Sequence, residues 1–377
     1  MSFSGTFWMS KASDKNFRSS LRFVLVTRHL NRSGFACLEH LLDAGFVPQS
    51  VIVSSKKPSL SSMWRRPFVI GFYRLKCWFY RCQPLRMLES EELYARKNGI
   101  QVIRLASLKS AIAKEVIDSF NLDLLIVAGG WHEKIPIAVL QRPRYGSINV
   151  HPSMLPEFRG TSITRWQILE GVDKSGVTIH KMDDDFDSGA TIAQTEVAVS
   201  SKATPQSLFQ QLADASGPLL VEVLNAMLAG RSLFQKRRQL EQRYLRYFSK
   251  WKWDSSVLTL DPDNEFASLN AHVLAATQES YEYPGPQLRL NGNSFMIRKT
   301  FIGSRTRGDE SLPIRENIAV IDRRYLRWER LGEPHALMIE QIQPCDAFYY
   351  LRRADAPARW FKNNEPVTIT AVESAVT

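Results

Sequence analysis

Four short apolar runs, each separated from the next by a segment with helical periodicity, are the feature of this chain that most restricts its fold. The runs are rich in β-branched residues and lack polar alternation, which is typical of strands buried on both faces of a parallel sheet. They lie at 22–27, 50–55, 100–105 and 122–130, and the helical segments lie at 34–44, 88–98 and 109–120. Because strands that alternate with helices form βαβ units, the sequence predicts an α/β fold with an open, mostly parallel, Rossmann-like sheet.

The loop after the first strand lacks the glycine fingerprint of dinucleotide-binding folds. It reads RHLNRSGF instead of GxGxxG, so dinucleotide binding is not supported. In open parallel sheets, ligands bind beyond the carboxyl ends of the strands. The fourth run ends at 129–131 and a fifth buried strand ends at 149–151, so we expect the ligand site there.

Three polar side chains are candidates for chemistry at this edge of the sheet. Asn149 and His151 alternate along the fifth strand, so their side chains point to the same face. Asp187 lies in an acidic loop that ends at Gly189 and follows another apolar run at 177–182. An amide, an imidazole and a carboxylate together suit an acyl transfer from a carbonyl carbon to an amine.

Each of these side chains also has a purely structural interpretation. Asn149 can cap a turn, His151 can be a structural turn histidine, and Asp187 can be an ordinary loop acid. The acids at 183–185 lack the spaced ligands of a calcium loop, so no metal site is predicted. Ser153 has no GxSxG context and is not predicted to be a nucleophile.

The candidates belong to a longer ordered pattern, which consists of Asn149, His151, Ser153, Leu155, Pro156, Arg159, Gly160, Gly176, Thr178, Asp187 and Gly189. This pattern resembles the folate-dependent formyltransferase superfamily, most strongly over 123–199. The superfamily includes glycinamide ribonucleotide formyltransferase, methionyl-tRNA formyltransferase and the sugar N-formyltransferases. The resemblance implies that Asn149, His151 and Asp187 are catalytic in an enzyme that transfers the formyl group of N10-formyltetrahydrofolate to a primary amine, without a metal.

The resemblance also implies which residues bind the two substrates. The folate is expected to contact, partly through main-chain atoms, Gly130, Trp131, His132, Ile135, Leu155, Pro156, Asp183, Asp184 and Asp185. The acceptor amine is expected to contact Arg159, Gly160 and Trp166. Glycines at 129 and 130 let the backbone approach a flat ligand closely, while Trp131 can equally be a plain core aromatic.

The expected reaction sets three chemical requirements. The amine attacks in its neutral form, the formyl oxygen gains negative charge, and a proton leaves the attacking nitrogen. Asn149 and a protonated or hydrogen-bonded His151 can donate to that oxygen. Asp187 can accept the amine proton, directly or through water, and can fix the charge state of the imidazole.

Downstream of the catalytic region, the periodicity changes from helical to alternating. A helix is expected at 205–228, ended by Gly230, and a basic connector rich in aromatic residues follows it. A short helix at 263–276 precedes alternating strands with turn signals at 284–285 and 291–292. The predicted domains are a flexible arm at 1–21, a catalytic domain at 22–230, a basic linker at 231–262 and a small β-rich, OB-like domain at 263–377.

Charge and composition restrict the partners without choosing among them. The net charge of +11 favours phosphates, carboxylates, RNA or anionic lipid as partners. The segment 56–86 combines many Lys and Arg residues with aromatic residues and has no acid. It can pack on the protein or form a dimer contact, lie on a membrane surface, or bind RNA. The arm at 1–21 is interpreted as a disordered tail or an organelle transit peptide.

The cysteines and the hydropathy favour a soluble protein in a reducing compartment. The 4 cysteines show no CxxC spacing, and no apolar run approaches the roughly 20 residues that cross a bilayer. We therefore expect a cytoplasmic protein, and we also expect a homodimer, although the sequence does not determine the oligomeric state.

Two residues bear on the acceptor. Trp166 and His180 resemble the branches of the superfamily that act on small substrates, and they favour the amino group of a nucleotide-linked amino sugar. The charge, the basic connector and the β-rich domain favour methionyl-tRNA instead. A hydrolase that releases formate from the folate, and a non-catalytic membrane or scaffold module, are further alternatives.

Overall fold

The structure is a computed structural model, and its described residues form two compact units. It describes residues 21–29, 31–55, 90–231, 244–252, 259–276, 286–304, 318–322, 324–330, 333–345, 355–362 and 366–372. The first unit lies within 1–160, 174–198 and 209–248, and the second within 161–173, 199–208 and 249–377. The predictions for the arm at 1–20, the insertion at 56–86 and the turn at 284–285 fall outside the described residues, and the predicted domain limits stay a prediction.

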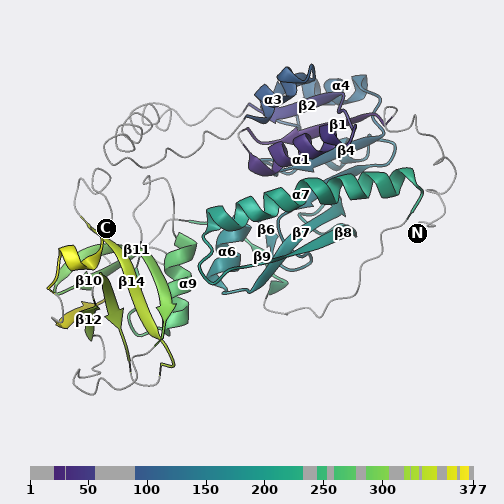
Figure 1. Ribbon diagram of the computed structural model, residues 1–377. Coiled ribbons are helices and arrows are strands. Elements are labelled where there is room, and N and C mark those ends of the chain that lie inside the picture. The colour runs from purple at the N-terminus through teal and green to yellow at the C-terminus, as the bar shows by residue number, and fades with distance from the viewer. Residues whose placement is uncertain are drawn as a thin grey trace. The chain divides into compact units, whose positions relative to one another are not determined.

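A seven-stranded sheet forms the centre of the first unit (Figure 1). Its strands are β1 (Phe23–Thr27), β2 (Ser50–Ser54), β3 (Gln101–Leu105), β4 (Leu124–Ala128), β5 (Ser147–His151), β7 (Lys174–Lys181) and β8 (Thr191–Ala198). The strand order is β3-β2-β1-β4-β5-β7-β8. The strands from β3 to β5 are parallel, while β7 and β8 are antiparallel to their neighbours. The prediction of a mostly parallel sheet is confirmed.

Capped helices connect the parallel strands. They are α1 (Arg32–Asp43), α3 (Glu91–Lys97), α4 (Ala111–Ser119) and the short α5 (Ile137–Leu140). The side chains of Asn31, Ser90 and Ser110 accept hydrogen bonds from the first-turn N–H groups of α1, α3 and α4, which fixes where each helix begins. β1, β4 and β5 are buried along their whole length, as continuous apolar strands of a parallel sheet require.

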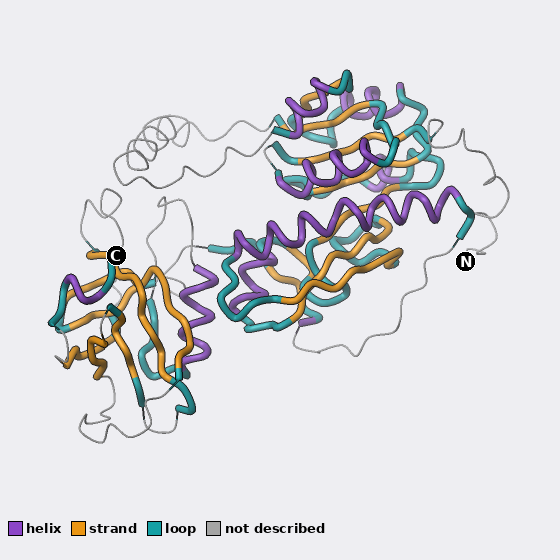
Figure 2. The backbone as a smooth tube through the Cα atoms, in the orientation of Figure 1, coloured by secondary structure: helices purple, strands orange, loops and turns teal. Residues whose placement is uncertain are grey.

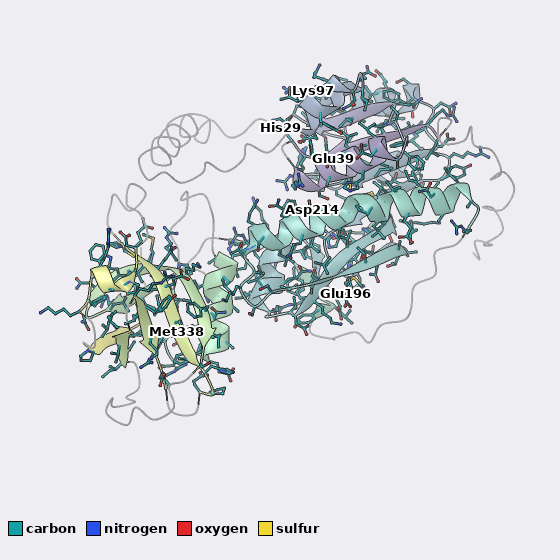
Figure 3. The ribbon with its side chains drawn as sticks, viewed as in Figure 1. His29, Glu39, Lys97, Glu196, Asp214 and Met338 are labelled. Atoms are coloured by element: carbon teal, nitrogen blue, oxygen red, sulfur yellow. The ribbon has the colours of Figure 1, made fainter. Side chains whose placement is uncertain are left out.

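The long helix α7 (Pro205–Leu228) has the predicted limits and packs against α1. Arg32 Nη2 lies 2.8 Å from Oδ1 of Asp214, which is labelled in Figure 3. Gly217 permits the close approach, because a Cβ there would come within 2.7 Å of the Ala36 carbonyl oxygen on α1. Among the described residues, none of the helices is long and apolar enough to cross a membrane.

A separate two-stranded parallel sheet forms from a segment that follows β5 in the chain and a segment of the basic connector. β6 (Arg159–Gly160) pairs with β9 (Tyr247–Phe248), so Arg159 lies opposite Tyr247 and Gly160 opposite Phe248. Strands of two residues leave no periodic pattern, and the sequence analysis predicts neither of them. They bring the basic connector of the sequence into contact with the loop after β5.

The second unit contains a closed six-stranded barrel, drawn in orange in Figure 2. Its strands are β10 (Gln287–Leu290), β11 (Asn293–Gly303), β12 (Ile318–Asp322), β13 (Tyr325–Trp328), β14 (Ala336–Pro344) and β15 (Pro366–Thr370), in the order β10-β11-β14-β13-β12-β15. Every pairing is antiparallel. The predicted β-rich, OB-like domain is confirmed.

Helices and one aromatic cluster complete the second unit. α6 (Ile163–Leu169) packs against α9 (Phe266–Ala276), and the 3₁₀ turn η4 (Pro357–Arg359) contacts the barrel. Trp328 is fully buried in the barrel core and its ring meets that of Phe266. Asn291 and Gly292 take positive φ angles of 48° and 79° between β10 and β11, so the hairpin turn predicted there is confirmed.

Candidate functional site

The two candidates on β5 are buried where the parallel part of the sheet ends. Asn149 and His151 are 9% and 4% exposed. β5 pairs antiparallel with β7, and this register places Asn149 opposite His180. Side chains that lie opposite each other across two strands project to the same face, so His180 joins the cluster. From the sequence His180 is only an indicator of the acceptor class, because its contact depends on the register.

His180 connects Asn149 to Asp187. Its Nε2 lies 3.1 Å from Asn149 Nδ2 and 3.7 Å from Asp187 Oδ1. Its Nδ1 lies 2.8 Å from the carbonyl oxygen of Lys181. Burial, and then the charge of His151, lower the pKa of His180. The ring is therefore neutral near pH 7.

His151 has a hydrogen-bond acceptor beside each ring nitrogen. Nδ1 lies 3.4 Å from Asp187 Oδ1, and Nε2 lies 3.0 Å from the carbonyl oxygen of Phe158. Burial opposes the charged form, but the charge and the hydrogen bond of Asp187 outweigh it and raise the pKa of His151. Since two acceptors require two N–H donors, we describe His151 as an imidazolium.

Asp187 is ionised although its side chain is largely buried. Burial raises the pKa of its carboxyl, but the charge of His151 and the hydrogen bonds from His151 and Gly160 lower that pKa to about 2. The Gly160 N–H donates to Asp187 Oδ2 at 2.9 Å. The φ of Asp187 is +52°, in the left-handed region that an aspartate tolerates better than most residues.

Gly160 is a backbone requirement of the site. Its φ is +120°, and a Cβ there would lie 2.1 Å from the carbonyl oxygen of Phe248 on β9. Any side chain would push β6 away from β9 and move the N–H that Asp187 accepts. The sequence analysis predicts Gly160 as an acceptor-binding residue; here its main chain holds the carboxylate.

A stack of aromatic rings holds the main-chain carbonyl of Phe158, which accepts a hydrogen bond from His151. Phe158 has a φ of +55°, an unfavourable conformation for a bulky residue. Its ring stacks on Tyr244 at 4.5 Å and on Phe248 at 4.9 Å between centroids. Its N–H donates to the carbonyl oxygen of Tyr244 at 2.9 Å. Sequence reasoning misses this stack, although the aromatic residues in the basic connector are a signal for it.

The acidic loop after β7 is tied to two neighbouring segments. Asp184 Oδ1 lies 3.1 Å from Lys134 Nζ, and Asp185 Oδ2 lies 3.1 Å from Arg159 Nη2. Asp183 Oδ1 accepts hydrogen bonds from the Asp185 N–H and from the Ser188 hydroxyl. These three acids therefore shape the loop that presents Asp187. Their predicted contact with folate stays a prediction.

The predicted folate segment follows β4. Gly129 and Gly130 have φ angles of +81° and +74°, and open space lies where Gly130 would carry a Cβ. The rings of Trp131 and His132 lie 4.9 Å apart. Ile135 is buried in the core, and Trp131 packs against the same core, so both predicted contacts also have a structural role.

Glu133 anchors this segment although the sequence analysis does not single it out. Its Oε1 accepts hydrogen bonds from the Ser107 hydroxyl, the Leu108 N–H and Trp131 Nε1. Burial opposes its charge, but these donors lower the pKa of its carboxyl. Glu133 thus fixes the indole of Trp131 at the carboxyl end of β4.

Leu155 and Pro156 lie on the other side of His151 in the chain. Leu155 is buried; its N–H donates to the Thr178 hydroxyl and its carbonyl oxygen accepts from Gln194 Nε2. Pro156 is exposed. Both main-chain hydrogen-bonding groups of Leu155 therefore already have partners within the first unit. A contact with folate would involve the Leu155 side chain or Pro156.

The predicted acceptor residues do not all belong to one unit. Arg159 lies in the first unit and donates from Nε and Nη2 to the carbonyl oxygen of Phe186. Trp166 lies in the second unit, where Nε1 donates to the Ser249 carbonyl oxygen and the ring meets Trp251 edge-on at 4.9 Å. The structure brings Asn149, His151 and Asp187 together, and it leaves the predicted role of Trp166 a prediction.

An exposed aromatic pair lies beside Arg159 and Asp187. Phe186 and Tyr247 are 44% and 48% exposed, and their ring centroids lie 6.2 Å apart. Burial, and then the negative charge of Asp187, raise the pKa of Tyr247. Among the described residues, no group of three or more His, Cys, Asp or Glu side chains could hold a metal ion.

The chain thus contains a mostly parallel sheet, with an Asn, His and Asp cluster at the end of β5, and an antiparallel barrel. Residues 85–224 match the model of the formyl transferase family. Over these residues the chain therefore contains a formyl transferase domain, and the resemblance predicted from the sequence is confirmed.

Relatives in sequence match less than half of the chain. The chain is 33% identical over 168 residues to the methionyl-tRNA formyltransferase of Lachnospira eligens, covering 44% of this chain and 53% of that relative. It is 34% identical over 137 residues to the methionyl-tRNA formyltransferase of Bacillus mycoides, covering 36% and 43%. The chain thus matches about half the length of these relatives.

Relatives in structure share more of the chain. An N-formyltransferase from Helicobacter canadensis, in complex with folinic acid and dTDP-3-aminofucose, covers 85% of this chain and 99% of its own, with a TM-score of 0.57 and 16% identity. WlaRD, a sugar 3N-formyl transferase with dTDP and 5-N-formyl-THF, covers 85% and 97%, with a TM-score of 0.56 and 15% identity. At these identities the likeness establishes a common fold.

Proposed function

We propose that this protein transfers the formyl group of N10-formyltetrahydrofolate to the amino group of a nucleotide-linked amino sugar. The observation that carries the proposal is the cluster of Asn149, His151 and Asp187, which meet around His180 at the carboxyl end of β5. Ligands of open parallel sheets bind at this edge. The chain supplies there a carboxamide, an imidazolium and a carboxylate, which is the equipment for acyl transfer to an amine.

The segment after β4 fits a flat ring such as a pterin. Gly130 leaves open space beside its main chain, and Glu133 holds the indole of Trp131 in one orientation. We therefore assign the folate to Gly130, Trp131 and His132. When bound, the folate supplies the formyl carbon and the nitrogen that departs from it.

His151 and Asp187 have different roles in the proposed reaction. The charge of His151 stabilises the negative charge that develops on the formyl oxygen, because a buried cation acts through a low dielectric. Asp187 is ionised and accepts the proton that the amine loses. The amine lone pair forms the new nitrogen–carbon bond and moves the carbonyl electron pair onto the formyl oxygen. When that pair re-forms the carbonyl, the bond from the carbon to the folate nitrogen breaks. One proton leaves the amine and one reaches the folate nitrogen, so the reaction balances.

The exposed pair of Phe186 and Tyr247 supports a nucleotide-linked acceptor. Two accessible rings beside the catalytic carboxylate offer a stacking surface for a base. The neighbouring guanidinium of Arg159 is suited to a phosphate. The common fold with two sugar N-formyltransferases over 85% of the chain agrees with this choice.

Methionyl-tRNA is the second candidate acceptor. The identity of 33% over 168 residues to a methionyl-tRNA formyltransferase favours it. The net charge of +11 agrees with an RNA partner. The homodimer, the cytoplasmic location, and the membrane or dimer role of 56–86 stay predictions.

A screen of acceptors tests the proposal. The full-length chain is incubated with N10-formyltetrahydrofolate and, separately, with dTDP- and UDP-linked amino sugars, methionyl-tRNA or no acceptor, and folate absorbance and product mass are recorded. Formylated amino sugar is the expected product, and it should disappear in Asp187→Asn but persist in Glu196→Gln, which changes an exposed carboxylate of β8 outside the predicted site. Formyl-methionyl-tRNA as the product would overturn the choice of acceptor, formate release without an acceptor would indicate a hydrolase, and no turnover of folate would overturn the proposal.

A further inference from the structure

Within the described part of the chain, one buried polar atom of the site has no hydrogen-bond partner. Asn149 Oδ1 is buried and makes no hydrogen bond within the described part of the chain, although the Nδ2 of the same carboxamide faces His180. Buried carbonyl oxygens are nearly always paired, because leaving water without a replacement donor is unfavourable. An unpaired oxygen inside a reaction site points to a donor on the substrate.

We propose that His180 is a positioning residue that holds the carboxamide of Asn149 with its oxygen toward the acceptor amine. The inference rests on the proposed formyl transfer, and it extends that function by assigning the orientation of one reacting group. It also changes the role expected from the sequence, in which Asn149 acts only as a donor to the formyl oxygen.

The tautomer of His180 follows from its hydrogen bonds. A carbonyl oxygen can only accept, so the nitrogen 2.8 Å from the Lys181 oxygen, Nδ1, carries the hydrogen. Three titratable groups, His151, Asp187 and Asp183, influence the ring through their charge, and the main-chain oxygen of Lys181 does so through a hydrogen bond. The two carboxylates favour a second proton, while burial and the His151 charge oppose it and prevail. Nε2 is therefore a bare acceptor nitrogen.

A bare Nε2 permits only one orientation of the Asn149 carboxamide. With Nδ2 at 3.1 Å, an N–H of Asn149 donates to the Nε2 lone pair. The flipped carboxamide would set an oxygen lone pair against that nitrogen, which is repulsive. His180 therefore fixes which end of Asn149 faces the substrate.

This orientation suits a primary amine. An amine that attacks a carbonyl carbon must direct its lone pair at the carbon, and its two N–H groups then need acceptors elsewhere. Asn149 Oδ1 and Asp187 are two such acceptors, and both residues adjoin His180 Nε2. The second N–H of Asn149 stays available for the formyl oxygen.

Nitrogen NMR tests the tautomer without any acceptor. In 15N-histidine-labelled protein near neutral pH, His180 should show a protonated Nδ1 and a bare Nε2, and His151 should show two protonated nitrogens. The signals are assigned with His180→Gln and His151→Gln. A proton on Nε2 of His180 would overturn the proposal whether or not the protein formylates any amine, so this result is separate from the acceptor screen.

A double-mutant cycle tests whether His180 acts through Asn149. His180→Leu should lower kcat about 10- to 100-fold, the usual range for groups that orient an active residue, with little change in the KM for folate. His180→Gln, whose side-chain oxygen can accept from Asn149, should recover most of that loss. In an Asn149→Ala background, His180→Leu should cost less than about two-fold, because the partner is gone. Independent, multiplicative losses in folded variants, or no rescue by Gln, would overturn the proposal.

Discussion

Asp187 and His151 carry opposite charges at a depth where burial alone would neutralise both. Asp187 raises the pKa of His151, and His151 lowers the pKa of Asp187, so each residue favours the charged form of the other. Burial opposes both shifts, but the effect of the charged partner is larger. The stability that Asp187 contributes is present above its unfolded pKa of about 3.9 and is lost as the pH falls through the folded value. The contribution of His151 is present below its unfolded pKa of about 6.5 and is lost as the pH rises through its raised folded value.

Asp187→Asn should therefore destabilise the protein most between about pH 4 and 6.5. In that window the wild type should exceed the variant in free energy of unfolding by on the order of 2 kcal/mol. The difference should shrink below pH 4 and again at alkaline pH. Urea unfolding across the pH range measures it.

Asp184→Asn is the matched control for this measurement. Asp184 belongs to the same loop, but its ion pair with Lys134 is exposed. Exposed pairs contribute little to stability, so the control should stay close to wild type at every pH. A difference for Asp187→Asn that does not vary with pH would show that the charge pair with His151 is not its cause.

At the residue scale, the sequence identifies the candidate catalytic residues but not how their side chains are oriented. Asn149, His151 and Asp187 are recognisable because a strand end and an acidic loop are local features. The role of His180 depends on its register opposite Asn149 and on a carbonyl oxygen beside Nδ1. Both facts follow from the pairing of β5 with β7, which no local pattern specifies.

Among the elements, β6 and β9 pair over only two residues each, yet this pairing supports the position of His151. It holds Phe158 between Tyr244 and Phe248, and the Phe158 carbonyl oxygen accepts from His151. Phe158 has an unfavourable φ of +55°. The contacts of its ring must therefore stabilise the protein by more than this backbone conformation costs.

Phe158→Ala should destabilise the protein by about 3–5 kcal/mol, the range for removing a buried aromatic ring. Turnover should also fall, because the carbonyl that orients His151 is released. Phe186→Ala, which removes a 44% exposed ring of the same type, should stay within about 0.5 kcal/mol of wild type. Thermal unfolding of both variants measures the contrast, and equal losses would show that the stack does not support the site.

The elements that the sequence predicts are those with a periodic pattern. β1, β2, β4 and α7 are predictable because continuous apolar runs and a long helical repeat leave little ambiguity. The strand β3 is also predicted, but as a buried strand, which is wrong: it lies at the edge of the sheet and only its last residue, Leu105, is buried. β6 and β9 are too short to produce a period, and α6 is not predicted either. The stack of Phe158 on Tyr244 and Phe248 depends on β6 and β9, so a periodic sequence pattern cannot predict it.

At the scale of the whole molecule, the net charge of +11 suits a short phosphate chain as well as a long one. The two candidate acceptors differ in how many phosphates the protein would neutralise. A nucleotide-linked sugar carries two phosphates, whereas an RNA contacts the protein along its backbone, and each neutralised phosphate adds to the dependence of binding on salt.

The dependence of kcat/KM on salt should therefore be shallow. For the nucleotide-linked amine, log kcat/KM against log salt should have a slope no steeper than about −2, since at most two phosphates are neutralised. A simple amine without phosphate, assayed in parallel, should give a slope near zero. A steep slope with methionyl-tRNA, together with higher kcat/KM for it at physiological salt, would favour the RNA acceptor.

The two-part organisation is predictable from the change in periodicity along the chain, and the closed barrel agrees with it. The acceptor is harder to predict, because the residues suited to recognise it come from a loop and from a two-residue strand. Phe186 and Tyr247 are 61 positions apart in numbering and meet only after folding.

The hydrogen bond from the Gly160 N–H to Asp187 is made by a peptide group. Proline is the one natural residue that lacks this N–H, and it cannot adopt the φ of +120° found here. Any other replacement of the glycine keeps the donor but brings a Cβ against β9. Semisynthesis that replaces this single amide by an ester would remove the hydrogen and keep every side chain in place. The carboxylate would then bind its proton more readily, which would isolate how much of its acidity comes from the backbone and how much from the imidazolium.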